Sequence, residues 1–336
     1  MMYERRTRGV RGFAAGFAHL VVLCIGLAPA GAVLAQAGFP SKPFRVIVPY
    51  TAGSAPDFVA RLLSERLATT LGQPVIVDNQ PGATGALGLT KLMQAPPDGY
   101  TLAWGAMPQA IQQMLIANAP YDMARDIAPV ILLGWDFNIL VVHPSVPARS
   151  VAELITYLKA NPGKLNFGSG GNGSPAHVLG EYFKQTTGTQ MVHVPYKGAV
   201  LAVQDLVAGR MQLMIGIAPS VMPHIRSGAL RPLAAAAPKR LPSVPDVPSM
   251  VEAGYPELAM GSWFGFVVPA ATPADIVVRL NREIGSIAAA ADLRSRIAAG
   301  GGAEITSSTP EEFRAIIVAD LERWRRVVRQ ANLKAD

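Results

Sequence analysis

Cysteine is the scarcest residue of this chain. Among 336 residues there is one, Cys24, and it falls within an N-terminal segment that we expect to be removed. The mature chain would then hold no cysteine, which excludes disulfide bonds, a thiolate nucleophile and a thiolate metal site. Any chemistry of the mature protein must therefore come from other groups.

Clustered charge is also scarce. Charged residues make up 16% of the chain, and its +7 net charge falls to about +4 when the first 35 residues, with four arginines and one glutamate, are removed. No run of lysine or arginine is interleaved with aromatic residues, so a nucleic-acid partner is not expected. A mildly basic protein can still attract anionic solutes.

Catalytic and cofactor motifs are missing as well. None of the five histidines forms an H-x-x-x-H pair or joins a carboxylate cluster, so no metal site is expected. Ser169 lacks the G-x-S-x-G frame of a nucleophile elbow, and no phosphate-binding P-loop occurs. Residues 168–173 match G-x-G-x-x-G, but the acidic residue that would hold a ribose about 20 positions later is absent. We therefore expect no cofactor and no enzymatic activity.

The N-terminus has the pattern of a secretory signal peptide. Four arginines before residue 12 precede an apolar stretch over residues 13–34, and small residues offer cleavage after Ala35 or Ala37. Gly26 and Pro29 interrupt this stretch, which is short for the alternative, a membrane anchor. We expect residues 1–35 to be a signal peptide and the mature protein to be periplasmic.

Strand and helix patterns alternate along most of the chain. This alternation predicts an α/β fold in which mainly parallel sheets are flanked by helices, and about 300 mature residues allow two domains. Ligands of such sheets bind beyond the carboxyl ends of the strands. The expected strands are 45–48, 75–78, 101–104, 139–143, 165–167, 191–194, 212–215 and 231–235, and the expected helices are 57–71, 84–94, 151–161, 176–187, 199–208, 274–289 and 310–330.

Two segments share one design, in which an apolar strand leads through a glycine-rich turn into a helix that begins at a proline. The turns lie in residues 44–57 and 165–175. A helix N-terminus presents unpaired backbone N–H groups and the positive end of the helix dipole, which suits a carboxylate or phosphate. Two such turns suggest one anion held between two domains.

Individual residues of these turns have more than one expected role. Gly53 and Gly173 have no Cβ and can bring backbone N–H groups close to a ligand. Asp57 could contact the ligand or simply cap its helix, and Ser174 can cap the helix that Pro175 begins. Tyr50 could line the site or belong to the core.

Several motifs resemble the Bug-type solute receptors of tripartite tricarboxylate transporters. They follow one another in the order of that family, from about Phe39 to the C-terminus. The matching segments are 43–53, 71–75, 79–83, 97–102, 160–166, 193–198, 241–248 and 252–255.

The resemblance implies a two-domain, Venus-flytrap receptor of the type II periplasmic-binding-protein fold. It places domain 1 in residues 38–142 plus 262–336 and domain 2 in residues 143–261. It also implies a monomer that captures a small organic acid, with backbone amides and bridging waters around one carboxylate, and delivers it to membrane permease subunits. A periplasmic sensing subunit and an exported α/β enzyme remain as alternatives.

The resemblance also indicates where the ligand would bind. Asp205 matches a position that binds ligand amino groups in some members. The other expected ligand-binding residues lie in the two turns: Tyr50, Ala52, Gly53, Ser54 and Asp57 in the first, and Ser169, Gly171, Asn172, Gly173, Ser174 and His177 in the second.

The chain departs from the family pattern near the expected pocket. A threonine hydroxyl is lost next to Pro56, Pro108-Gln109 replaces a Thr-His pair, and Gly216 replaces an aspartate. Because these changes remove polar groups, we expect a monocarboxylate, or an aromatic or aliphatic acid, to bind in preference to citrate.

Overall fold

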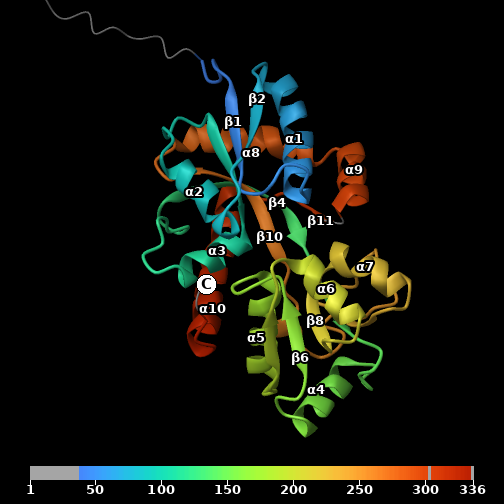
Figure 1. The fold of residues 1–336 in the computed structure, drawn as a ribbon. Helices are drawn as coiled ribbons and strands as arrows, with labels where there is room; N and C mark the ends of the chain where they lie inside the picture. Colours follow the sequence, from blue (N-terminus) through green and yellow to red (C-terminus); the bar gives the residue numbers. More distant parts are fainter. Residues whose placement is uncertain (1–37, 302–303, 334–336) are drawn as a thin grey trace, which may run out of the picture. The chain divides into compact units, whose positions relative to one another are not determined.

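The structure is a computed structural model that describes residues 38–301 and 304–333. The expected signal peptide, residues 1–35, lies outside the described residues. Within the described ranges, no helix has both the length and the apolar composition needed to cross a membrane. The fold is α/β, with two sheets flanked by helices (Figure 1).

The first sheet has six strands in the order β11-β4-β10-β3-β1-β2. Strand β1 runs parallel to β2 and β3, whereas β10 runs antiparallel to β3 and β4, and β11 runs antiparallel to β4. The strands are β1 (Phe44–Val48), β2 (Val75–Asn79), β3 (Thr101–Ala106), β4 (Ile127–Asp136), β10 (Ser262–Pro269) and β11 (Glu304–Ile305).

The second sheet has five strands in the order β7-β6-β8-β5-β9. Strand β6 is parallel to β7 and β8, and β5 is antiparallel to β8 and β9. The strands are β5 (Asn138–Val142), β6 (Asn166–Ser169), β7 (Val192–Pro195), β8 (Leu213–Ile217) and β9 (Arg231–Ala235). Strands β1, β2, β3 and β4 of the first sheet run in one direction, as do β6, β7, β8 and β9 of the second, whereas β10, β11 and β5 run opposite to their neighbours. The expectation of mainly parallel sheets flanked by helices is confirmed.

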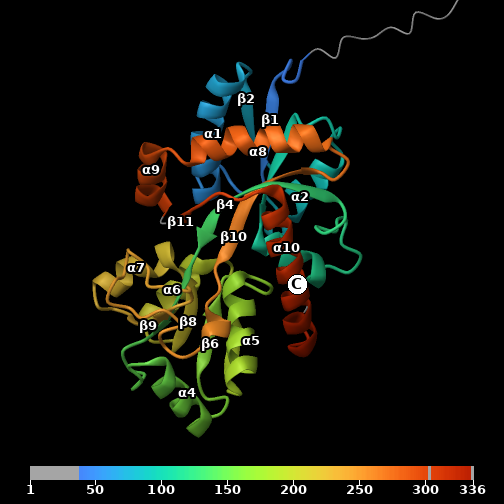
Figure 2. The same ribbon diagram turned by 180° about the vertical axis from the view of Figure 1, so that it is seen from behind.

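Helices cover both sheets, and we call each sheet with its helices a lobe. Helix α8 crosses the face of the first sheet that is turned toward the viewer in Figure 2. The helices of the first lobe are α1 (Ala55–Leu71), α2 (Ala86–Met93), α3 (Met107–Leu115), α8 (Ala274–Ala288), α9 (Ala291–Gly301) and α10 (Pro310–Gln330). Those of the second lobe are α4 (Val151–Ala160), α5 (Pro175–Thr187), α6 (Ala199–Val207) and α7 (Ala218–Arg226).

The chain crosses between the lobes on two neighbouring segments. A single residue, Phe137, separates β4 of the first sheet from β5 of the second. The return crossing leads into β10, whose first residue, Ser262, lies opposite Asp136 at the end of β4. The bounds of the two domains stay a proposal, and these sheets place the first crossing at Phe137 rather than after Val142.

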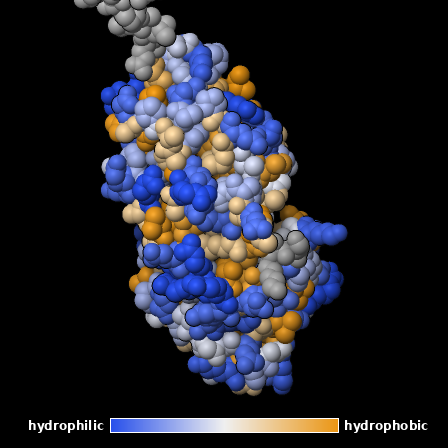
Figure 3. Space-filling model, turned by 90° about the vertical axis from the view of Figure 1, so that its left-hand side faces the viewer, coloured by the Kyte–Doolittle hydropathy of each residue, from blue (hydrophilic) through white to orange (hydrophobic). Residues whose placement is uncertain are grey.

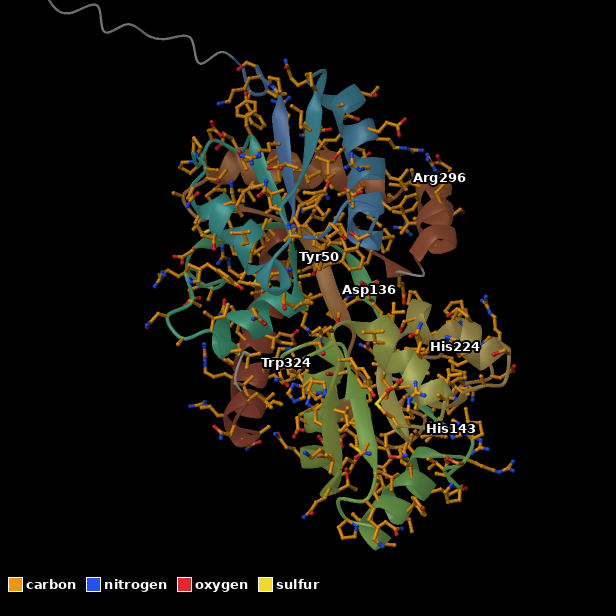
Figure 4. The ribbon with its side chains drawn as sticks, viewed as in Figure 1. Tyr50, Asp136, His143, His224, Arg296 and Trp324 are labelled. Atoms are coloured by element: carbon orange, nitrogen blue, oxygen red, sulfur yellow. The ribbon has the colours of Figure 1, made fainter. Side chains whose placement is uncertain are left out.

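Helix α10 packs against both lobes and so links them in addition to the two chain crossings. Thr309 and Glu312 form a capping box at its start, with Thr309 N donating to Glu312 Oε2 (2.8 Å) and Glu312 N donating to Thr309 Oγ1 (3.1 Å). The helix packs on β4 and α3 of the first lobe and on α5 of the second. There the ring of Trp324, labelled in Figure 4, meets the ring of Tyr182 edge-on. The two ring centroids are 6.0 Å apart. The C-terminal helix therefore fixes one edge of the second lobe against the first.

Candidate functional site

A cavity of about 570 Å³ lies where the two sheets meet. Most of its wall is apolar, and on the face shown in Figure 3 hydrophobic side chains also gather near the middle of the molecule. The residues that line it come from both lobes and include Tyr50, Ala55, Pro56, Thr84, Trp104 and Pro108 of the first, Asn138, Gly170, Ser174, Pro175, Ala176 and Met214 of the second, and Asp136 at the crossing. Both glycine turns thus reach one cavity.

The first turn is built around Asp57. Gly53 has φ +80°, a left-handed conformation that side chains disfavour, and Ser54 stands at the N-cap of α1. The Asp57 carboxylate accepts hydrogen bonds from Gly53 N (2.8 Å), Arg61 Nε (3.0 Å) and Asn79 Nδ2 (2.9 Å). Asp57 is only 3% exposed, so its carboxylate holds the turn together from inside.

The second turn repeats this construction in the other lobe. Gly173 has φ +72°, and its N–H donates to Nδ1 of His177, four residues later (3.1 Å). Ser174 stands at the N-cap of α5, and its hydroxyl accepts a hydrogen bond from His177 N. In each lobe the glycine N–H therefore donates a hydrogen bond to the side chain four residues later.

The donors that face the cavity are accordingly not the ones expected. We expected the N–H groups of Gly53 and Gly173 to approach the ligand, but each has an intramolecular acceptor. Ala55 and Ala176, in the first turns of α1 and α5, both line the cavity. Within residues 38–301 and 304–333 no acceptor reaches either alanine N–H, as is usual for the first residues of a helix. These two amides are the better candidates for binding an anion.

Gly53→Ala is expected to weaken anion binding by about tenfold or more, because alanine resists the left-handed conformation and the turn would relax. Gly72→Ala is the matched control, since Gly72 has φ +65° and ends α1. A Cβ at either position meets nothing within 4 Å. Both variants should lose about 1 kcal/mol of stability. Equal ligand affinity of the two variants in calorimetric titration would contradict the role of the first turn.

The half-buried Tyr50 and the buried Gln109 form a hydrogen-bonded pair on the first-lobe side of the cavity. Gln109 Nε2 donates to the Tyr50 hydroxyl (3.1 Å), and Gln109 Oε1 accepts from Ala106 N (2.8 Å). Burial raises the pKa of Tyr50 to about 12, with a smaller contribution from the negative charge of Asp136. Tyr50 therefore offers a neutral hydroxyl beside the cavity.

Ser169 and two histidines form a stack beneath the second turn. Ser169 Oγ lies 2.7 Å from His193 Nε2, and the rings of His177 and His193 are stacked with centroids 3.6 Å apart. No motif in the sequence indicates this serine–histidine pair. Ser169 is 0% exposed, and its hydroxyl also donates to Gly171 O and accepts from Gly171 N. These contacts hold Ser169 inside the turn, where its hydroxyl helps to fix the backbone of Gly171.

The structure divides the expected site residues into three groups. Tyr50 and Ser174 line the cavity directly. Asp205 does not line it, because its carboxylate is engaged by the Tyr196 hydroxyl (2.7 Å) and by Arg210. The remaining expected residues belong to the two turns, and three of them, Asp57, Ser169 and His177, are buried. The full set is Ala52, Gly53, Ser54, Asp57, Ser169, Gly171, Asn172, Gly173 and His177.

The sequence reasoning missed the residues that the crossing segment contributes. Asp136 and Asn138, on either side of Phe137, both line the cavity. Figure 4 shows Asp136 beside Tyr50 at the level between the sheets, whereas His143 and His224 lie away from both, in the second lobe. A charged residue directly after the uncharged run 127–135 was the available signal.

Comparison with known proteins decides the family. The model of the tripartite tricarboxylate transporter family receptor matches residues 59–333. The chain belongs to this family. Protein BugT of Bordetella pertussis is 37% identical to this receptor over 319 residues, which are 94% of this chain and 98% of BugT. The resemblance seen in the sequence is therefore confirmed.

Solved structures of other receptors agree with this assignment. An R. palustris protein determined with adipate is 33% identical and gives a TM-score of 0.73, with 89% of this chain and 100% of that chain covered. MatC from Rhodopseudomonas palustris with bound malate is 30% identical, with a TM-score of 0.69 and coverages of 86% and 100%. These neighbours confirm the expected fold class, the two-domain type II periplasmic-binding-protein fold.

Proposed function

We propose that this receptor captures a small organic acid in the cavity between its lobes. The observation that carries the proposal is the pair of matched turns, each presenting an unpaired alanine amide at a helix N-terminus to the same cavity. Helices of 17 and 13 residues direct their positive ends there, which favours a carboxylate. Relatives determined with adipate and malate support a carboxylate ligand.

We further propose that the receptor acts in the periplasm as a monomer and delivers its ligand to the permease subunits of a tripartite transporter. The family assignment supports this role. A sensing subunit would bind the same ligand in the same way, and the alternatives differ only in the partner that recognises the loaded receptor. The buried position of Ser169 argues against the third alternative, an exported enzyme.

A thermal-shift screen of the mature protein against mono- and dicarboxylates tests this function. A ligand at 100 times its Kd should stabilise the protein by about 2.7 kcal/mol, which raises the melting temperature measurably. The ligand should be recovered unchanged after prolonged incubation. A screen in which amines or sugars stabilise the protein and carboxylates do not would refute the proposal.

A further inference from the structure

Asp136 places a carboxylate side chain in a cavity that we propose binds carboxylates, and the binding of a simple carboxylate does not account for it. It ends β4, lines the cavity, and also lines a second cavity of about 350 Å³ on the other side of the crossing. No donor or cation in the described part of the chain forms a hydrogen bond or an ion pair with its carboxyl group. Burial alone raises the pKa of Asp136 to about 7.

Asn138 adds a second unsatisfied group to the same wall. It is 2% exposed, and its Nδ2 has no acceptor within the described residues. A buried polar group without a partner costs free energy, and the cost is usually recovered by a ligand or a bound water. Asn138 is such a group, and the partly buried Asp136 lies on the same mostly apolar wall, separated from it only by Phe137. Together they indicate that a polar part of the ligand meets the crossing segment.

The negative charge of an ionised Asp136 restricts the chemical groups that this polar part of the ligand can carry. A carboxylate acts only as an acceptor when ionised, and a second ligand carboxylate near it would be repelled. A ligand ammonium both donates hydrogen bonds and neutralises the charge. Asp205, the residue expected to hold an amino group, lies outside the cavity and is engaged by Arg210.

From this geometry we infer that the ligand is an amino acid whose carboxylate binds at the two turns and whose ammonium group contacts Asp136. The inference rests on the proposed function and narrows it to one class of acid. It predicts that this receptor discriminates against dicarboxylates of similar length.

Matched triplets of acids test the inference by calorimetric titration. Each triplet has the same skeleton and ends in an ammonium, a methyl or a second carboxylate group: 4-aminobutanoate, butanoate and succinate; 6-aminohexanoate, hexanoate and adipate; and 4-(aminomethyl)benzoate, 4-methylbenzoate and terephthalate. In at least one triplet the ammonium member should bind about 30-fold tighter than the others, as expected for a buried charge pair. Asp136→Asn should abolish this preference and leave the Kd of the methyl member within about threefold, whereas Asp275→Asn on the exposed surface of α8 should preserve it.

The pH dependence of binding gives a second readout. Affinity for the ammonium member should rise between about pH 5 and 8, since Asp136 must lose its proton, and the Asp136→Asn variant should not show the rise. The groups that face Asp136 are Tyr50 on one side and Arg294 and Glu304 across the second cavity, where Glu304 is paired with Lys239 at 3.1 Å. The methyl member of the same triplet is the internal control for the titration of Tyr50, Arg294 and Glu304, because it has no ammonium group to pair with Asp136.

Three results would overturn the inference while leaving the proposed function intact. They are a best-binding acid without a nitrogen donor, an ammonium preference that survives Asp136→Asn, and a preference that is lost instead in Asp205→Asn. Failure of every carboxylate to bind would refute the proposed function and this inference together.

Discussion

Replacing Asp57 by alanine is expected to lower the affinity for the carboxylate ligand by about 100-fold and to destabilise the protein by about 2–4 kcal/mol. The carboxylate of Asp57 is the shared acceptor of Gly53 N, Arg61 Nε and Asn79 Nδ2, and it is almost fully buried. Without it, these donors lose their partner and the turn loses the bond that sets the direction of the Ala55 amide. Calorimetric titration and thermal unfolding measure the two effects.

The stabilisation by Asp57 should also depend on pH in a defined direction. Burial raises the pKa of Asp57, but the hydrogen bonds from Arg61, Gly53 and Asn79 outweigh burial, so its pKa lies below the ordinary value. The contribution is therefore fully present above the unfolded-state pKa near 3.8 and is lost as the pH falls below it.

Asp292→Ala is the matched control for Asp57→Ala, because Asp292 forms an exposed ion pair with Arg66 far from the cavity. It should change stability by less than about 1 kcal/mol and leave binding unchanged. If Asp57→Ala bound its ligand as tightly as the parent protein, Asp57 would be only a helix cap, and the structural role assigned to the first turn would be wrong.

Replacing Asp136 by asparagine is expected to stabilise the ligand-free protein near pH 8 and to have little effect near pH 4. The folded-state pKa of Asp136 is raised from 3.8 to about 7, so the native protein holds this proton more tightly than the unfolded chain. Stability contributed by the protonated group is thus fully present below about pH 4 and is lost as the pH rises toward 7. The upper bound of the loss is about 4 kcal/mol.

Water that enters the cavity should reduce this loss, and we expect Asp136→Asn to gain about 1–3 kcal/mol near pH 8. That gain corresponds to a rise in melting temperature of several degrees for a protein of this size. The measurement is thermal unfolding of both proteins without ligand across this pH range. A constant difference at all pH values, or a destabilised variant near pH 8, would show that Asp136 is ionised and paired in the native state.

The local elements of the fold could be predicted from the sequence because their signals are local. The strand Arg231–Ala235 has the expected bounds, and α5 and α6 differ from expectation by one residue at an end. Strands β4 and β10 were missed because both are buried along most of their length and so lack an alternating pattern. Strand β10 runs antiparallel to its neighbours β3 and β4, and both missed strands adjoin the crossings between the lobes.

The candidate site was located from the sequence, but its donors were not assigned correctly. Gly-Ser followed by alanine and proline in either order is visible in both turns, as is a polar residue four positions after each glycine. That Asp57 and His177 accept the glycine N–H groups depends on side-chain directions, which the pattern does not encode. Asp136 reaches the cavity only because the chain crosses between the sheets directly after it.

The most direct test of the central claim, that both turns hold one carboxylate, is an amide NMR titration of the ¹⁵N-labelled mature protein with its best-binding organic acid. The N–H resonances of Ala55 and Ala176 should both shift, and the two titration curves should give the same Kd. A bound acid that moves the amide of only one lobe, or of neither, would contradict this claim.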